Sequence, residues 1–198
     1  MKYTQIPTDT FATLQLNAGI LVSGANGFVP ETGTVVSGNI IGATTGGIAV
    51  SCTPTYLDFG ENVDNCPKNM MELKKIDSWD CKISGTFVTV DTTAAKIMLG
   101  ASDIDSIDTT KVTPRNDLYS SDFQDIWFVG DYSDKNGATN GGFFAVHMKN
   151  ALSTGGFQMQ TGDKEKGQFE VEFTGHVSIN AQDIVPMEFY IKAGTAEA

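Results

Sequence analysis

The chain has 198 residues, which is long enough for one domain to bury a hydrophobic core without disulfides or metals. It carries 13 Lys and Arg against 24 Asp and Glu, so its formal net charge is -11 and its pI is near 4.4. This charge argues against a protein that holds nucleic acid by neutralising phosphates, although an acidic surface can face DNA where repulsion is useful.

The N-terminal residues show no basic segment followed by an apolar one, as a secretory signal would. No stretch approaches the roughly 20 apolar residues of a membrane span. We therefore expect a soluble protein that is made in a cytosol and does not bind a membrane by itself.

Residues 11–22 are the first predicted strand. Apolar and polar side chains alternate along them, the pattern of a β-strand with one face on a core and the other in water. The apolar positions are Leu14, Leu16, Ala18, Ile20 and Val22, and the polar ones include Thr13, Gln15 and Asn17.

Residues 23–45 follow as a long connection rich in Gly, Ser, Thr and Asn, without a period of its own. Connections of this length in a compact domain often bind something or become ordered in an assembly. A mobile hairpin extension is the simpler alternative. The apolar residues that we expect to contact neighbouring copies are Phe28, Val35, Val36, Ile40 and Ile41.

Residues 47–53 and 79–90 repeat the alternation of a half-buried strand. Between them, residues 56–75 change from acidic to basic. A solvated face is the ordinary interpretation, but this division also suits head-to-tail stacking of copies. The charged residues of this segment are Asp58, Glu61, Asp64, Lys68, Lys74 and Lys75.

A single short helix is predicted at Thr92–Leu99. Asp91 is a suitable N-cap, Gly100 follows the last helical residue, and the apolar residues between them favour a helix that covers the core.

Further strands are predicted at Gln124–Tyr132 and at residues 142–150, 155–160 and 186–192. The first two are almost continuously apolar, as in Ile126, Trp127 and Phe128, which suits a second sheet buried on both faces or covered by a neighbouring chain.

Residues 168–180 show the clearest alternation of the chain, with Phe169, Val171, Phe173, Val177 and Ile179 on the apolar side. Four strands thus share a polar face, on which acids exceed bases by two. The polar-face candidates are Thr13, Gln15, Asn17, Ser51, Thr53, Asp80, Lys82, Ser84, Thr86, Glu170, Glu172, Thr174, His176 and Ser178.

Catalytic, metal and cofactor motifs are missing from the sequence. Cys52, Cys66 and Cys81 form no CxxC pair and are expected to be reduced, structural thiols. His147 and His176 lie in strand patterns without nearby ligands at zinc spacing. The paired glycines lack the flanking residues of a phosphate-binding loop and are interpreted as turns or bulges. We expect no enzyme, no metal and no cofactor.

Four segments closely resemble the major tail protein, or tail tube protein, of long non-contractile-tailed bacteriophages and related prophages. They are residues 65–90, 113–118, 125–157 and 168–191, and the resemblance as a whole extends over most of the chain. The resemblance is weakest over residues 23–45 and the last six residues.

The resemblance implies a mainly β fold of two packed antiparallel sheets with one short flanking α-helix. It implies a single domain over residues 1–198, with an assembly loop at 23–45 and a short flexible tail at 193–198. Subunits would form six-fold rings that stack into a tube in the virion tail, assembled in the bacterial host cytoplasm. The polar-face candidates would line the bore, through which DNA passes without specific binding, and the loop and charged residues would stack the rings. Implied partners are other copies, a tape measure protein and tail tip and terminator proteins.

Two other classes remain open from the residues alone. A soluble β-sandwich that binds a carbohydrate or a protein would use exposed aromatics such as Trp127 and Tyr132. An enzyme would need a clustered acid and base, for which Asp131, Asp134 and His147 are the least poor candidates, although both aspartates lie in a turn-like sequence.

Overall fold

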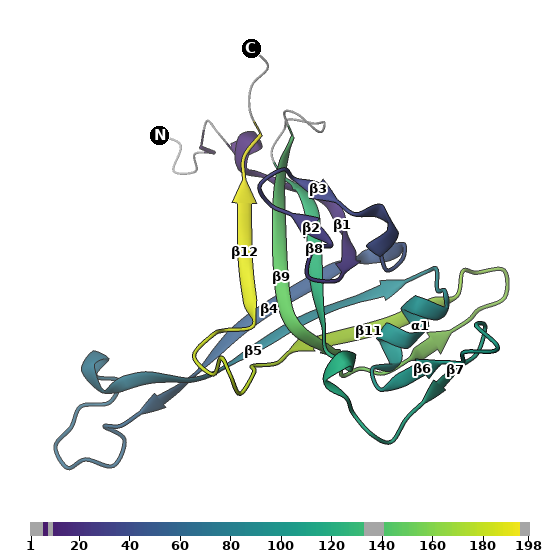
Figure 1. Cartoon of the computed structure of the whole chain (residues 1–198). Coiled ribbons are helices and arrows are strands. Elements are labelled where there is room, and N and C mark those ends of the chain that lie inside the picture. The colour runs from purple at the N-terminus through teal and green to yellow at the C-terminus, as the bar shows by residue number, and fades with distance from the viewer. Residues whose placement is uncertain (1–5, 8–9, 133–140, 195–198) are drawn as a thin grey trace.

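The structure is a computed structural model that describes residues 6–7, 10–132 and 141–194. It is mainly β, as predicted, with one α-helix and three antiparallel sheets among the described residues (Figure 1). The strands are β1 (Gln15–Ser23), β2 (Phe28–Val29), β3 (Thr34–Val35), β4 (Thr44–Asp58), β5 (Lys74–Phe87), β6 (Ser102–Ile104), β7 (Val112–Pro114), β8 (Gln124–Tyr132), β9 (Gly142–Ser153), β10 (Gln158–Gln160), β11 (Gln168–Gly175) and β12 (Met187–Lys192). The helices are the 3-10 turns η1 (Thr10–Thr13), η2 (Ser37–Asn39), η3 (Met71–Leu73) and η4 (Ser120–Asp122) and the α-helix α1 (Thr92–Leu99).

The largest sheet has two layers that cross each other. One layer, here called the polar layer, consists of β4, β5, β11 and β10. The other, the upright layer, consists of β1, β8, β9 and β12, which run across the polar layer in Figure 1. The predicted pair of sheets is thus present as two layers of one hydrogen-bonded sheet.

Strand β9 joins the two layers. Most of its length pairs with β8 and β12, whereas Ala151, Leu152 and Ser153 at its end pair with Gly175, Thr174 and Phe173 of β11. Every strand pair in this sheet is antiparallel.

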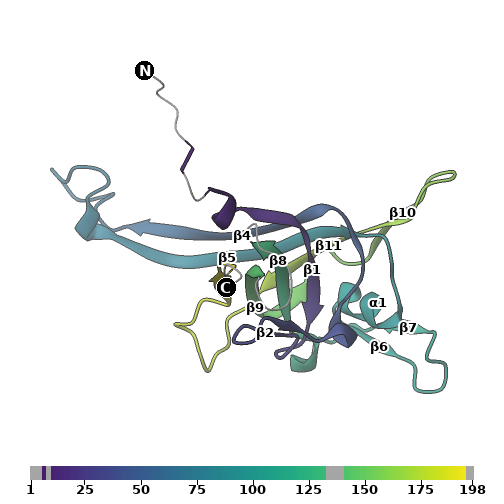
Figure 2. The same ribbon diagram turned by 90° about the horizontal axis from the view of Figure 1, so that it is seen from above.

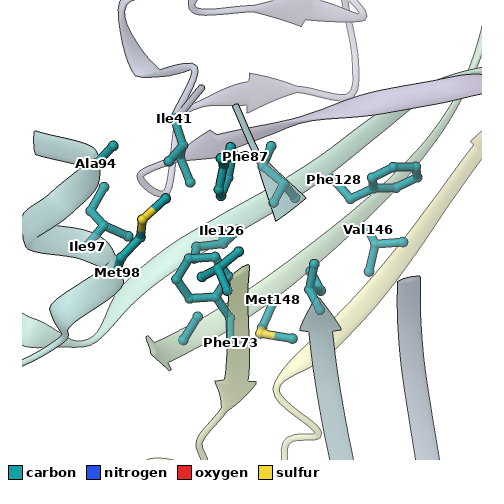
Figure 3. Close-up of a cluster of buried hydrophobic side chains, with 14 of the residues drawn as sticks. Ile41, Phe87, Ala94, Ile97, Met98, Ile126, Phe128, Val146, Met148 and Phe173 are labelled. Atoms are coloured by element: carbon teal, nitrogen blue, oxygen red, sulfur yellow. The ribbon is translucent and has the colours of Figure 1, made fainter. Parts of the chain in front are cut away.

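The hydrophobic core lies between the layers and under α1 (Figure 3). Helix α1 has the predicted bounds, and the Asp91 carboxylate accepts a hydrogen bond from the Ala94 N–H at 2.6 Å. Gly100 ends the helix with a φ of 73°, a conformation that a residue with a Cβ rarely adopts. The core residues labelled in Figure 3 are Ile41, Phe87, Ala94, Ile97, Met98, Ile126, Phe128, Val146, Met148 and Phe173.

Residues 23–45 are folded against the body of the same chain. They form the β2–β3 hairpin, in which Phe28 is buried edge-on against Trp127 and Phe143, with ring centroids 5.5 and 4.9 Å away. Ile41 joins the main core. Phe28 and Ile41 thus pack in two different clusters of the chain's own body, and the expectation that this segment binds a neighbouring copy or becomes ordered in an assembly stays a prediction.

The first and last polar-faced strands differ from prediction. In β1 the pairing with β8 shifts between Leu16 and Ile20, and Asn17 has a φ of 60°, so the alternation is broken by a bulge. Strand β11 ends at Gly175, and the chain then turns, leaving Val177 59% and Ile179 82% exposed. Both were predicted to face the core.

The pairing of β4 with β5 extends far beyond the predicted strands. Figure 2 shows the two strands running side by side past the rest of the molecule to a terminal loop. We call residues 53–80 the arm, because Thr53 and Asp80 are paired and every β5 residue from Lys74 to Asp80 is exposed. The charged segment at 56–75 therefore belongs to the arm. Of the predicted flexible tail, residues 195–198 lie outside the described part of the chain.

Candidate functional site

The polar layer presents one continuous hydrophilic face. Cross-strand partners lie on the same face of a sheet, and Thr53 pairs with Asp80, Ser51 with Lys82, and Lys82 with Thr174. Ser84 likewise pairs with Glu172 and Thr86 with Glu170. The predicted residues brought together on this face are Ser51, Thr53, Asp80, Lys82, Ser84, Thr86, Glu170, Glu172 and Thr174.

The opposite face of the same strands is buried. Cys81, Ile83, Phe87, Val171 and Phe173 alternate with the polar residues and lie in the core. The predicted alternation is therefore confirmed for β5 from Cys81 to Phe87 and for β11 up to its end, whereas Trp79, at an apolar-side position of the same predicted strand, is exposed.

The polar face carries more acidic than basic side chains, and its one lysine lies between two of the acids. Lys82 Nζ lies 3.6 Å from an Asp80 oxygen and 3.8 Å from a Glu172 oxygen, so the single base is shared between two acids. These side chains are substantially exposed, so the ion pairs contribute little stability. Thr154 Oγ1 is 2.8 Å from Thr174 Oγ1 and also contacts Glu172. With Glu170 added, the face carries a surplus of two negative charges.

A shallow hollow of about 560 Å³ lies on this face. Its floor contains Gly46, Gly47, Gly85 and Gly155, and Glu170 is among its walls. Gly46 and Gly47 have φ angles of 75° and 89°, where the pairing of β4 with β5 shifts. They are bulge glycines, as predicted, and none of the residues that line the hollow is basic, so it does not suit a phosphate.

Five predicted polar-face residues lie elsewhere. Thr13 is in η1, and Gln15 and Asn17 belong to β1 in the upright layer, where Asn17 donates a hydrogen bond to Asp131 at 2.7 Å. His176 and Ser178 follow the end of β11. The prediction was wrong for these five residues because alternation along one strand does not show which strands become neighbours in the sheet.

Residues 11–22 were predicted to contribute a strand to the polar face. Strand β10 occupies that place in the polar layer instead. Gln158 pairs with Glu170 and Gln160 with Gln168, so both glutamines join the polar face. Their polar–apolar–polar pattern was the only signal in the sequence, and three residues are too few to establish a period.

The polar layer has two open edges in the described part of the chain. Strand β4 has a hydrogen-bonded neighbour only on the β5 side, and β10 only on the β11 side. Open edges expose unpaired backbone groups that favour the addition of another strand.

The arm exposes apolar side chains on both strands and on its terminal loop. Met71 is 79% exposed, and Phe59 and Ile76 are more than half exposed. Several exposed large apolar side chains on one protruding element are typical of an interaction site. The exposed apolar residues of the arm are Tyr56, Leu57, Phe59, Val63, Met70, Met71, Ile76 and Trp79.

The predicted stacking residues separate into two groups. Asp58, Glu61, Asp64, Lys68, Lys74 and Lys75 all lie on the arm. Of the apolar candidates, Val36 and Ile40 are exposed and Val35 is half-buried. Phe28 and Ile41 are buried in the chain's own core, which removes them from any contact surface.

The enzyme candidates do not form a cluster in the described residues. Asp134 lies outside those residues, and Asp131 is bonded to Asn17. His147 is only 8% exposed, stacks on Trp127 with centroids 3.9 Å apart, and bonds Asp125 at 3.0 Å.

His147 lies in a network of polar side chains with Asp125, Glu188 and Lys149. Its hydrogen bond lowers the pKa of Asp125, against the opposing effect of burial. The hydrogen bond donated by Lys149 likewise lowers the pKa of Glu188, whose other oxygen lies 3.6 Å from His147 Nδ1. Trp127 is buried beneath this network and cannot serve as the exposed aromatic platform of a binding module.

Residues 6–7, 10–132 and 141–194 contain no group of three or more His, Cys, Asp or Glu side chains arranged to hold a metal ion. Within the same residues, no helix has the length and apolar character needed to cross a membrane.

The fold and these surfaces define a mainly β protein of the β-sandwich class, with an acidic sheet face and a projecting arm. No protein-family model matches the chain, and no curated protein is significantly similar to it in sequence.

Proposed function

We propose that this chain is a structural virion protein that polymerises as stacked rings into the tail tube of a long-tailed bacteriophage. The observation that carries the proposal is the polar layer, which has one buried face, one acidic and hydroxylated face, and an open strand at each edge. A sheet of this kind fits the wall of a large, water-filled barrel built from several copies.

Ring closure would follow from the two open edges. When β4 of one copy lies beside β10 of the next, the unpaired backbone groups of both strands gain partners, and a closed barrel has no edges left. Six copies in a ring are implied by the sequence resemblance. The surplus of acids would then be repeated around the bore and repel DNA phosphates, so that the genome slides without being captured.

Ring stacking would follow from the arm. Its exposed apolar residues gain stability only when another surface covers them, and about 25 cal/mol is gained for each Å² of apolar surface removed from water. The arm projects from the body (Figure 2), so it would extend toward a neighbouring ring in such a stack. A tape measure protein and tail tip and terminator proteins would be further partners in the virion tail, which is assembled in the host cytoplasm.

Negative-stain electron microscopy of the concentrated, purified protein tests this proposal. We expect rings or tubes of uniform diameter. A protein that stays monomeric at high concentration, both in micrographs and in sedimentation, contradicts the proposal.

A variant without the arm makes the test specific. Residues 55–78 are replaced by an Asn-Gly turn, which suits a two-residue hairpin between Pro54 and Trp79. No residue of the main core lies in the deleted segment, so the variant should fold with the thermal stability of the parent. We expect it to form no stacked tubes. Tubes of normal length from this variant would show that the arm is not the stacking element.

A further inference from the structure

Two of the three cysteines face each other across the paired strands β4 and β5. Cys52 and Cys81 are directly opposite in the register, and their sulfurs are 3.3 Å apart as free thiols. Opposite residues in an antiparallel pair have Cα atoms about 4.5 or 5.5 Å apart, and both separations lie within the range that a disulfide spans. The backbone therefore already holds the geometry that a cross-strand disulfide requires.

The two thiols differ in access to solvent. Cys81 is fully buried, and Cys52 is half-buried on the edge strand. Burial, together with the hydrogen bond to Cys52 and the charges of Cys52 and Asp80, raises the pKa of Cys81 to about 12. Cys81 is therefore protonated at neutral pH, and a small oxidant meets Cys52 first.

The pair lies at the root of the arm. Cys81 is the first buried residue of β5, because all positions from Lys74 to Asp80 are exposed. Farther out, the pairing is interrupted by a shift between Thr55 and Tyr56. A covalent link between Cys52 and Cys81 would fix the two strands to each other at the point where they leave the core.

We propose that Cys52 and Cys81 are a redox-active pair that a peroxide closes into a disulfide across the root of the arm. The Cys52 thiolate attacks one oxygen of hydrogen peroxide, the O–O bond breaks, and a sulfenic acid forms as hydroxide takes up a proton to leave as water. The Cys81 sulfur then attacks the Cys52 sulfur, the S–O bond breaks, and the Cys81 proton leaves with the hydroxyl group as a second water. In total, two thiols and one peroxide give one disulfide and two waters.

The disulfide restricts relative motion of the two strands at the base of the arm. Amide hydrogens of residues 76–80 should therefore exchange more slowly in the oxidised chain than in the reduced one. The pair requires only the geometry of a single chain. Its effect on stacked rings rests on the proposed function, since a tube assembled in a reducing cytoplasm would meet oxidants only after release.

Counting thiols tests the pair directly. The full-length reduced protein is treated with hydrogen peroxide, unfolded in the presence of a maleimide and weighed by mass spectrometry. The reduced protein should carry three maleimides, one for each cysteine. The oxidised protein should carry one, on Cys66, and its digest should contain a peptide that joins Cys52 to Cys81. A dithiol reductant should restore three.

Two variants serve as controls. Cys66→Ser should bind two maleimides when reduced and none when oxidised, whereas Cys52→Ser should bind two under both conditions. An oxidised parent chain that still binds three maleimides, or a disulfide that includes Cys66, overturns the proposal. Unchanged amide exchange at residues 76–80 in a chain that carries the disulfide overturns the stiffening of the arm. None of these measurements depends on assembly, so they can succeed where tube formation fails.

Discussion

Strands β4 and β5 run through both the body and the arm, and their apolar side chains are covered in the body but exposed in the arm. Inside the body, Ile48, Val50, Ile83 and Phe87 pack against the core. Beyond Thr53 and Asp80, the same two strands carry apolar residues that remain in water. The backbone pairing is continuous across the boundary, so the difference depends on what covers the sheet. The body contains its own cover, whereas the apolar residues of the arm have none within this chain.

The largest effect should come from truncating the body. Phe173 is 1% exposed at the centre of β11, so Phe173→Ala should cost about 3–5 kcal/mol in the free energy of unfolding. Thr174→Ala, one residue along on the polar face, should cost far less. Urea unfolding of both variants measures the contrast. Equal losses would show that burial does not separate the two faces of β11.

Removal of the half-buried Asp125 charge should have the next largest effect. Asp125 accepts hydrogen bonds from His147 at 3.0 Å and from the Asn150 N–H at 3.1 Å. Asp125→Asn weakens both contacts and should cost about 1.5–3 kcal/mol. Asp183→Asn, at an exposed position, is the matched control and should change little.

Two carboxylates near His147, those of Asp125 and Glu188, contribute to the way in which stability responds to acid. The pKa values of Asp125 and Glu188 are lowered in the folded chain, from ordinary values of 3.8 and 4.5. Their contribution to stability is therefore present above those ordinary values and is lost as the pH falls through the lower, folded values. Unfolding curves between pH 7 and pH 2 should show a smaller acid-induced loss for Asp125→Asn than for the parent. Parallel losses would mean that this network does not govern the acid response.

Changes to the arm should leave stability nearly unaltered and alter assembly instead. Leu57→Glu with Phe59→Glu places charges on an exposed apolar surface, so the free energy of unfolding should stay within about 0.5 kcal/mol of the parent. Assembly should be lost, because the added carboxylates cannot be buried unpaired between copies. Sedimentation measures the assembly and urea unfolding the stability. A large loss of stability would show that the arm is part of the folding unit.

The smallest effect on folding is expected at the polar face. Glu170→Lys with Glu172→Lys changes the charge by four per chain and leaves the buried side of β11 intact. If this face lines a bore, tubes of the variant should bind short duplex DNA in a salt-dependent way, and virions built from it should fail at DNA delivery. Asp117→Lys with Asp183→Lys makes the same charge change away from the polar layer. DNA binding by the control alone, or by neither, would place the bore elsewhere.

The sequence predicted elements whose signal is local. Helix α1 could be predicted from its N-cap, its apolar face and Gly100 alone. The two faces of β5 and β11 could be predicted from the alternation of polar and apolar residues. Strand order could not be predicted. Strand β10, for example, has only three residues, and their sequence alone does not specify that they pair with β11. The arm was missed as an extension because its polar and apolar residues follow no burial pattern where neither face is covered.

Because β9 belongs to both layers, it affects how the molecule unfolds. A strand that pairs with β8 and β12 along most of its length and with β11 at its end cannot leave one layer without pulling on the other. The body should therefore unfold as a single cooperative unit, with the slowest-exchanging amides concentrated in β9. A pull applied along the polar layer should therefore meet the combined resistance of both layers.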